Sequence, residues 1–308
     1  MSARIVSFGS INMDLVVRAP HLPKPGESLI GRTFYTAPGG KGANQAVAVA
    51  RLGAHSIMIG RVGEDVFADT LRASLRSYGV DADHVATAAG QPSGVALITV
   101  DDNAENNIVI VPGANDAFTD DDLTRTEQTL QGASALLVQL EVPLDKVIAA
   151  MECAKRLGVK VILDPAPIRP LPEAIYQAVD VITPNETEAS ALVGFVVDKP
   201  EAAARAAQTL FERGVKTAVI KMGSKGAYWQ HAGQDGHFVP AFKVKAIDTV
   251  AAGDAFNGGL ALALSENRPF AEAIRWGCAT GALSTTKAGA QPSMPTRAEV
   301  EQLLHEQG

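Results

Sequence analysis

Cysteine is scarce in this chain of 308 residues, which contains only Cys153 and Cys278. Two cysteines cannot form the disulfide network that holds small secreted domains together, so the sequence favours a reducing compartment. Both thiols are most simply interpreted as small apolar side chains buried in helices. The six histidines are scattered and neither CxxC nor HxxxH occurs, so a structural zinc site is not expected.

Long apolar runs and excess positive charge are missing as well. No apolar stretch approaches the roughly 20 residues of a membrane-spanning helix, and the first residues lack the apolar segment of a signal peptide. We therefore expect a cytoplasmic protein with no membrane partner. The net charge of −7, without a Lys/Arg-rich run, argues against a nucleic-acid partner. A small molecule or a second copy of the chain is the expected partner.

Short apolar segments alternate with amphipathic segments along most of the chain. This pattern is typical of a mostly parallel sheet that is covered by helices on both faces. We expect one α/β domain over residues 1–308, with a central, mostly parallel sheet flanked by helices. The expected strands are Ile5–Phe8, Ser56–Gly60, Leu136–Leu140, Val159–Leu163, Val181–Thr183 and Ala218–Lys221, with a hairpin around Ala227–Val239. The expected helices are Asp65–Tyr78, Leu144–Leu157, Pro200–Arg213, Gly253–Ser265, Pro269–Thr286 and Thr296–Gln307.

Two segments, residues 13–35 and 93–111, interrupt this alternation. The second contains GVALITV and NNIVIV around a polar turn, which predicts a β-hairpin with few polar positions on either face. We expect the two segments to form a small β-sheet lid, with substrate under one face and a second subunit against the other, giving a homodimer. A hairpin packed on its own main domain is the alternative, and the sequence leaves both open.

A glycine-rich turn leads directly into an alanine-rich helix at Ala37–Gly53, APGGKGANQAVAVARLG. Glycine lets backbone N–H groups approach a polar ligand, and a helix N-terminus attracts negative charge. Lys41 is followed by Gly42 rather than Ser or Thr, so this is not a Walker A loop. The spacing also differs from GxGxxG, which argues against a dehydrogenase. By itself, such a turn is more often a tight connection than a binding site.

The segment Lys245–Leu264, KAIDTVAAGDAFNGGLALAL, places small residues at the start of another helix. Several backbone N–H groups without helical partners should therefore lie beside the carboxylate of Asp254. Such amides can stabilise charge on a migrating phosphoryl group, and a carboxylate can take the proton of the attacking hydroxyl. The alternative is that Asp254 only caps the helix.

These two segments resemble the characteristic segments of the ribokinase-like family of carbohydrate kinases, almost residue for residue in GGKGANQA and DTVAAGDAFNGG. The resemblance continues in order through GSINMD, QLEVP, TPNETE, GSKG and KAGAQPS, over essentially the whole chain. It implies the family's fold and an ATP-dependent sugar kinase. The full set of segments implies phosphorylation of D-ribose at the O5 primary hydroxyl to D-ribose 5-phosphate, with D-ribose and ATP as partners.

The resemblance also implies which residues bind the sugar. They are Asn12, Asp14, Gly40, Lys41, Asn44, Glu141 and Asp254. Asn12 and Asp14 follow the first strand, and a carboxylate can accept hydrogen bonds from two vicinal hydroxyls. In open α/β sheets, ligands gather beyond the carboxyl ends of the strands, where these residues are expected to lie.

For the nucleotide and the chemistry, the resemblance implies that Asp254 is the general base. The anion hole is implied at Ala251, Ala252, Gly253 and Asp254. The implied nucleotide-binding residues are Asn185, Lys221, Gly223, Ser224, Lys225, Gly226, Gly253, Asp254 and Cys278. Asn185 and Glu188 match an N-x-x-E motif that organises Mg²⁺ and phosphate, with Glu188 reaching the ion through water. Without the resemblance, both would be ordinary helix-start residues.

An activating monovalent cation, K⁺, is also implied beside the anion hole. The matching positions are Asp248, Val250, Ser284, Lys287, Gly289 and Ser293. Most of them would bind through backbone carbonyls, and Asp248 is the exception. The implied cofactors are therefore Mg²⁺, which accompanies ATP, and K⁺.

Two positions depart from the family's pattern. Lys221 stands where Thr is common, and Cys278 stands where a polar residue often faces the nucleotide, which leaves the phosphate donor open. The alternative functions are a kinase of deoxyribose, another pentose or a nucleoside, and an inactive sugar-binding regulator. Only 5% of residues are aromatic, which argues against a base-binding nucleoside kinase, and the intact AAGD segment argues against the regulator.

Overall fold

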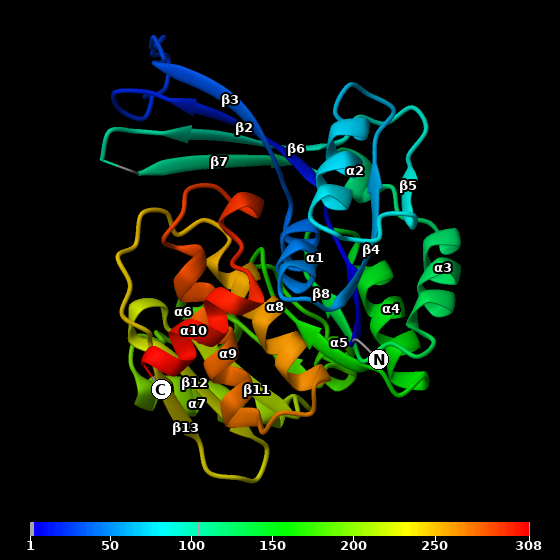
Figure 1. The fold of residues 1–308 in the computed structure, drawn as a ribbon, viewed down its shortest axis with the longest axis vertical. Helices are drawn as coiled ribbons and strands as arrows, with labels where there is room; N and C mark the ends of the chain where they lie inside the picture. The colour runs from blue at the N-terminus through cyan, green and yellow to red at the C-terminus, as the bar shows by residue number, and fades with distance from the viewer. Residues whose placement is uncertain (1–2, 104, 308) are drawn as a thin grey trace.

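The computed structural model describes residues 3–103 and 105–307. Residues 1, 2, 104 and 308 of the predicted domain, including one residue of the predicted lid, lie outside the described residues. Within them, nine strands form one sheet in the order β13-β12-β11-β10-β9-β8-β1-β4-β5 (Figure 1). In this order, each pair of adjacent strands between β11 and β5 is parallel. The pairs β11–β12 and β12–β13 are antiparallel. The bounds are Arg4–Phe8 (β1), His55–Val62 (β4), Val85–Thr87 (β5), Ala135–Val138 (β8), Lys160–Leu163 (β9), Val181–Ile182 (β10), Thr217–Lys221 (β11), Gly226–His231 (β12) and His237–Pro240 (β13).

Helices cover both faces of this sheet (Figure 1). They are Lys41–Arg51 (α1), Ala68–Ser77 (α2), Asp120–Leu130 (α3), Leu144–Arg156 (α4), Glu173–Ala178 (α5), Glu186–Val193 (α6), Pro200–Glu212 (α7), Ala252–Ser265 (α8), Phe270–Ser284 (α9) and Arg297–Glu306 (α10). Short 3-10 turns occur at Gly113–Asp116, Gly223–Lys225 and Gln291–Ser293. Neighbouring residues of a strand point to opposite faces, so Val6 packs in one core with Met151 and Leu210, whereas Ile5 packs in the other with Leu260.

The predicted fold class is confirmed, because the strands buried on both faces are the near-continuous apolar runs of the sequence. One boundary differs in a way that affects the site. β8 ends at Val138 rather than Leu140, so Gln139 and Glu141 leave the sheet at its carboxyl edge. Among the helices of the described residues, none combines the length and the apolar character needed to cross a membrane.

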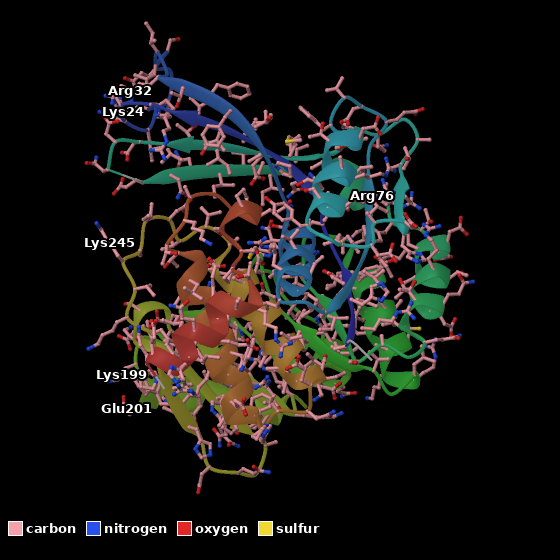
Figure 2. All side chains as sticks on the ribbon, in the orientation of Figure 1. Lys24, Arg32, Arg76, Lys199, Glu201 and Lys245 are labelled. Carbon is pink, nitrogen blue, oxygen red and sulfur yellow. The ribbon has the colours of Figure 1, made fainter. Side chains whose placement is uncertain are left out.

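A second, smaller sheet projects from the main domain (Figure 1). Its strands have the order β3-β2-β6-β7 and the bounds Asn12–Arg18 (β2), Thr33–Gly39 (β3), Gly94–Val100 (β6) and Asn106–Val111 (β7). Lys24 and Arg32 lie at its far end (Figure 2). The predicted hairpin is present as β6 and β7. β3 continues past the predicted limit at residue 35 and runs directly into α1. That this sheet acts as a lid remains a prediction.

Both faces of β7 are open in the single chain. Ile108 and Val109 point to opposite faces and are 53% and 58% exposed, and Phe34 on β3 is 64% exposed. An exposed apolar sheet of this kind commonly marks an interaction surface. We expect light scattering to find a dimer at micromolar concentration, and Ile108→Lys or Val109→Lys to shift it towards monomer. The control is Val66→Lys, at an 85% exposed position outside the sheet. A monomeric wild-type protein would contradict the pairing but not the lid.

Candidate active site

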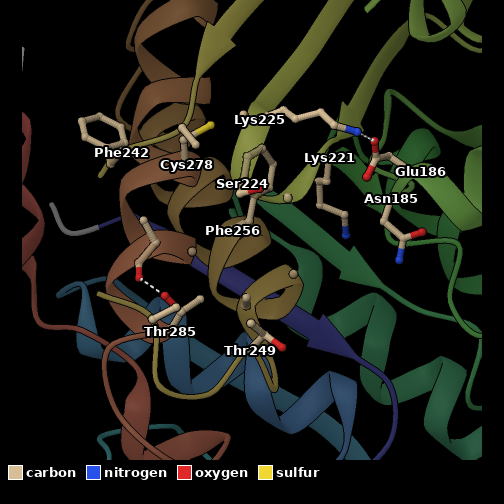
Figure 3. Close-up of a pocket in the computed structure, with 18 of the residues that line it drawn as sticks. Asn185, Glu186, Lys221, Ser224, Lys225, Phe242, Thr249, Phe256, Cys278 and Thr285 are labelled. Carbon is tan, nitrogen blue, oxygen red and sulfur yellow. Dashed lines mark hydrogen bonds and ion pairs between the residues drawn. The ribbon is translucent and has the colours of Figure 1, made fainter. Parts of the chain in front are cut away.

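A cavity of about 910 Å³ opens where three parallel strands of the main sheet end. Asp164 follows β9, Asn185 follows β10, and Lys221 is the last residue of β11; all three line the cavity. Asn185 and Lys221 lie at one end of it, and Phe242 and Cys278 lie at the other (Figure 3). The carboxyl edge of an open parallel sheet is the usual ligand site of such folds, so the cavity is the candidate active site.

The start of α8 forms one wall of this cavity. Ala251 precedes the helix in the left-handed conformation, with φ of 59°, which costs roughly 1–2 kcal/mol for a residue with a Cβ. Helix geometry leaves the N–H groups of Gly253 and Asp254 without an intrahelical acceptor. Ala252 does not fit its predicted role in the anion hole, because its N–H already donates to the carbonyl of Thr249 at 3.3 Å. The amides of Gly253 and Asp254 are therefore the ones best placed to meet an anion.

Asp254 is a buried carboxylate, 4% exposed, in the first turn of α8. Its Oδ2 accepts a hydrogen bond from Asn44 Nδ2 at 3.0 Å, and its Oδ1 accepts one from Gln45 Nε2 at 3.1 Å. Burial raises the pKa of Asp254 to about 6; Lys41 opposes this rise and Asp164 adds to it. A carboxylate with such a pKa is mostly ionised at neutral pH and can still accept a proton readily. Asp254 does not cap α8 with its side chain, since the position before the helix is Ala251.

Asn12 and Asp14 on β2 approach the same region as Glu141, which follows β8. Asn115 Nδ2 donates to Asn12 Oδ1 at 2.7 Å and so fixes the Asn12 amide. Glu141 accepts hydrogen bonds from the hydroxyl of Ser10 and from the backbone N–H of Lys41. Burial, together with the charges of Glu141 and Asp254, raises the pKa of Asp14 to about 7. The charges of Glu141 and Asp254 both act on Asp14, so the structure brings these three predicted sugar-binding carboxylates together.

Two glycines shape this part of the site. Gly40 precedes α1 with φ of 91°, and a Cβ there would lie 2.7 Å from the backbone nitrogen of Asn12. A Cβ on Gly39 would lie 2.4 Å from Asp14 Oδ2. Only glycine fits these positions without displacing neighbouring groups. Lys41 begins α1, and although burial opposes its charge, the surrounding Asp254, Asp164, Glu141 and Glu188 raise its pKa.

Asn185 and Glu188 satisfy each other at the start of α6. Glu188 Oε2 accepts from the backbone N–H of Asn185 at 2.8 Å, and Glu188 Oε1 accepts from Asn185 Nδ2 at 2.9 Å. The backbone N–H of Glu188 donates back to Asn185 Oδ1 at 2.8 Å, which completes a capping box. The simple helix-start interpretation is therefore correct for their geometry. Both residues also line the cavity, so the cap does not remove them from the site.

The predicted nucleotide loop, Gly223–Gly226, also lines the cavity. Gly226 has φ of 127°, and a Cβ there would lie 2.0 Å from the carbonyl oxygen of Val239. Lys225 Nζ donates to Glu186 Oε1 at 2.6 Å, which ties the loop to α6 (Figure 3). Cys278 is 8% exposed in the cavity wall, and burial raises the pKa of its thiol to about 12. Such a thiol is a neutral, apolar surface at physiological pH.

The predicted K⁺ positions lie before α8 and between the end of α9 and the 3-10 turn Gln291–Ser293, and Asp248 joins these two segments. Its Oδ1 accepts from the backbone N–H of Val250 at 3.0 Å, and its Oδ2 accepts from that of Gly289 at 2.9 Å. Ser284 and Ser293 are buried and donate their hydroxyls to carbonyls of their own turns. Lys287 directs its ammonium to Glu299 Oε1 at 2.7 Å, so only its carbonyl is available.

Three polar residues of the site, Gln45, Gln139 and Asp164, were not predicted from the sequence. Gln45 Nε2 donates to Asp164 Oδ2 at 3.1 Å as well as to Asp254, and Gln139 Nε2 donates to Gln45 Oε1 at 2.7 Å. Lys221 Nζ donates to Asp164 Oδ1 at 2.9 Å. The available signal was position, because Asp164 directly follows a predicted strand, and both glutamines lie inside GGKGANQA and QLEVP, two of the segments that carry the family resemblance.

Comparisons with known proteins cover nearly the whole chain. A family model described as pfkB family carbohydrate kinase matches residues 2–297. A ribokinase of Haemophilus influenzae is 42% identical over 304 residues, which cover 99% of each chain. A deoxyribokinase of Salmonella typhi is 38% identical over 97% of this chain and 98% of that protein. A structure of Arabidopsis thaliana ribokinase complexed with ribose and ATP superposes with a TM-score of 0.92, at 34% identity over 99% of both chains.

Proposed function

Because the chain belongs to the pfkB family of carbohydrate kinases and is an ATP-dependent sugar kinase, we propose that it phosphorylates D-ribose at the O5 primary hydroxyl. The observation that carries this proposal is the place of Asp254. Its buried carboxylate lies between Asn44, on the sugar side, and the cavity that holds the Gly223–Gly226 loop. Ribose is favoured because similar proteins are named ribokinases and one is described in complex with ribose and ATP.

The reaction follows from these positions. The O5 oxygen attacks the γ-phosphorus of ATP, so an O–P bond forms while the bond to the bridging oxygen breaks, and ADP leaves with that oxygen. Asp254 accepts the proton of the hydroxyl, and the amides of Gly253 and Asp254 stabilise charge on the transferred group. Asn12, Asp14 and Glu141 hold the sugar so that O5 faces Asp254.

The residues present suit Mg²⁺ and K⁺. The structure shows no group of three or more His, Cys, Asp or Glu that could hold a metal ion within the described residues, and Mg²⁺ commonly binds through substrate phosphates and water. The oxygens of Glu188 each accept one hydrogen bond and keep further acceptor capacity for a water of the ion. Bound Mg²⁺ would neutralise charge on the phosphates. The carboxylate of Asp248 would supply hard oxygen donors for K⁺, since each of its oxygens accepts one backbone N–H and keeps further acceptor capacity.

Deoxyribose is the second candidate substrate, because a relative named deoxyribokinase is nearly as similar as the ribokinases. A coupled assay of ADP release with pentoses, hexoses and nucleosides tests the proposal. We expect the highest kcat/KM for D-ribose, with D-ribose 5-phosphate as product. A higher value for 2-deoxyribose would establish the alternative, and activity on none of the sugars would refute both.

Activity and stability should respond to pH in opposite directions. Asp14 and Asp254 have raised pKa values, of about 7 and about 6, chiefly because they are buried. The charged groups that face them are Lys41, Glu141, Asp164, Glu188 and Lys221. Both carboxyls must be ionised to work, so kcat/KM should rise from pH 5.5 to 7.5, a range that brackets these two pKa values.

A raised carboxyl pKa stabilises the fold below its ordinary value and loses that contribution as pH rises through the raised value. These two groups should therefore lower the melting temperature of the ligand-free protein as pH rises over the same range. Asp14→Asn should remove the higher of the two activity transitions, because an amide does not titrate in this range. A kcat/KM that does not change between pH 5.5 and 7.5, the window set by those pKa values, would contradict the assignment.

Potassium should activate the enzyme more than sodium does. An ion between the loops that Asp248 joins would fix the segment that leads into α8 and its amides. The effect should therefore appear mainly in kcat rather than in the sugar KM. Steady-state assays in K⁺, Na⁺ and tetramethylammonium check this, with Asp248→Asn as the matched variant. Equal rates in all three cations would refute the site.

A further inference from the structure

Asp164 joins the nucleotide side of the site to the sugar side. It is 2% exposed, and its Oδ1 accepts from Lys221 Nζ at 2.9 Å while its Oδ2 accepts from Gln45 Nε2 at 3.1 Å. The same Gln45 nitrogen donates to Asp254 Oδ1 at 3.1 Å. An unbroken chain of polar contacts therefore runs from the cavity wall at Lys221 to the proposed base.

The amide of Gln45 is fixed in one orientation. A side-chain amide has two donor hydrogens, and here one is directed to each carboxylate. Gln45 Oε1 accepts from Gln139 Nε2 at 2.7 Å, and both glutamines are fully buried. A flipped amide would set its oxygen against Asp164 and Asp254 and its NH₂ group against that of Gln139. Leaving buried polar groups unpaired is costly, so the bridge holds Asp254 in a defined position.

Lys221 lies at the other end of the chain, beside the start of α8. A Cβ on Gly253 would be 3.2 Å from Lys221 Nζ, so the ammonium sits next to the first amides of the helix. The Lys221 side chain is 11% exposed and lines the cavity together with Asn185 (Figure 3). An ammonium and helix N-terminal amides that face one space form a strong site for phosphate oxygens. Asp164 holds the ammonium there.

We propose that Asp164 is a positioning residue for phosphoryl transfer, which holds Lys221 against the phosphate chain of ATP and, through Gln45, directs Asp254 at the sugar hydroxyl. This inference rests on the proposed kinase function and deepens it. It also gives a role to a departure from the family's pattern, since the Thr that is common at position 221 could not form this ion pair.

The charge of Asp164 gives the proposal a specific signature. Burial is the main reason why the pKa of Asp254 is raised; Lys41 lowers that pKa and Asp164 raises it. Neutralising Asp164 should therefore lower the pKa of Asp254. The acidic limb of the kcat profile should move to lower pH, which a loss of packing alone would not produce.

The test compares Asp164→Asn and Lys221→Met with the wild type. We expect Asp164→Asn to lower kcat by about 10–100-fold, because small misplacement of reacting groups has effects of this order. Its sugar KM should stay near the wild-type value while its acidic limb shifts. Lys221→Met should weaken ATP binding about tenfold or more, as the loss of a charge-assisted hydrogen bond does. Calorimetry with ATP in EDTA measures this affinity without metal.

A matched control is available in another buried ion pair, Arg61 with Asp122, whose atoms are 2.7 Å apart. Neither residue lines the cavity. Asp122→Asn should lower the melting temperature without changing the pH profile or the ATP affinity. The double variant Asp164→Asn/Lys221→Met removes both charges of the active-site pair and guards against a single variant that does not fold. It should combine the shifted acidic limb with the weakened ATP affinity.

Wild-type kcat and pH profile in Asp164→Asn would overturn the proposal. A change in melting temperature alone, as in Asp122→Asn, would also overturn it and leave the pair a stabilising contact. Failure of the proposed function would look different, because the wild-type protein would then not phosphorylate ribose. ATP affinity and the acidic limb, measured with whichever sugar is the substrate, would still decide the role of Asp164.

Discussion

Replacing Asp254 with Asn is expected to lower kcat by about 10²–10⁴-fold, the usual contribution of a positioned general base. The amide keeps the shape of the side chain but cannot take the proton of the sugar hydroxyl. Sugar and ATP should still bind, because the partners on α1 and the α8 amides remain. A coupled assay measures the loss of turnover, and calorimetry measures whether the affinities for sugar and ATP are retained.

Stability provides the control for this variant. The pKa of Asp254 is raised by burial, so its ionised form opposes folding above about pH 6. Asp254→Asn should therefore keep or raise the melting temperature at pH 8. Near-wild-type turnover would show that Asp254 is only a residue of the first helical turn. Lost turnover together with a collapsed melting temperature would make the variant uninformative about the base, and Asp254→Ser would then replace it.

Replacing Asp14 with Ala is expected to raise the ribose KM by about 10–100-fold, since a charge-assisted hydrogen bond contributes about 1.5–3 kcal/mol. Asp14 can accept hydrogen bonds from vicinal hydroxyls, and 2-deoxyribose lacks one of that pair. The variant should therefore lose more affinity for ribose than for deoxyribose, and the preference between them should narrow. The ATP KM should not change, which initial-rate measurements with each substrate would show.

Gly39→Ala is the matched variant for this effect, because the added Cβ would lie 2.4 Å from Asp14 Oδ2 and displace the carboxylate. Its φ is not in the left-handed region, so the backbone tolerates alanine. It should change sugar KM in the same direction with Asp14 still present. An unchanged sugar KM in both variants would remove Asp14 from the sugar site.

Much of the main sheet could be predicted because its strands are buried on both faces and so are apolar without interruption. Val159–Leu163 and Ala218–Lys221 match β9 and β11 within one residue at each end. The family resemblance, and with it the sugar-kinase class, is confirmed. The smaller sheet was predicted in part: the two apolar runs around a polar turn correspond to β6 and β7, but the other segment was expected to end at residue 35, whereas β3 continues to Gly39.

The network inside the site could not be predicted, because it depends on contacts between residues far apart in sequence. Gln45 and Asp164 are separated by 119 positions, and Asn115 reaches Asn12 over 103. Neither pairing leaves a local pattern. The conformation of Ala251 could not be predicted either, since alanine does not favour the left-handed conformation that it adopts before α8. Such strain is sustained only where the surrounding structure enforces it.

Competition between the two candidate sugars tests the central claim most directly. The wild-type protein receives equal, saturating amounts of D-ribose and 2-deoxy-D-ribose with limiting ATP, and ³¹P nuclear magnetic resonance identifies the phosphate esters formed. We predict that D-ribose 5-phosphate dominates, with phosphorus coupled to the protons on C5. An equal or larger yield of deoxyribose 5-phosphate, or an ester at another hydroxyl, would contradict the proposed function.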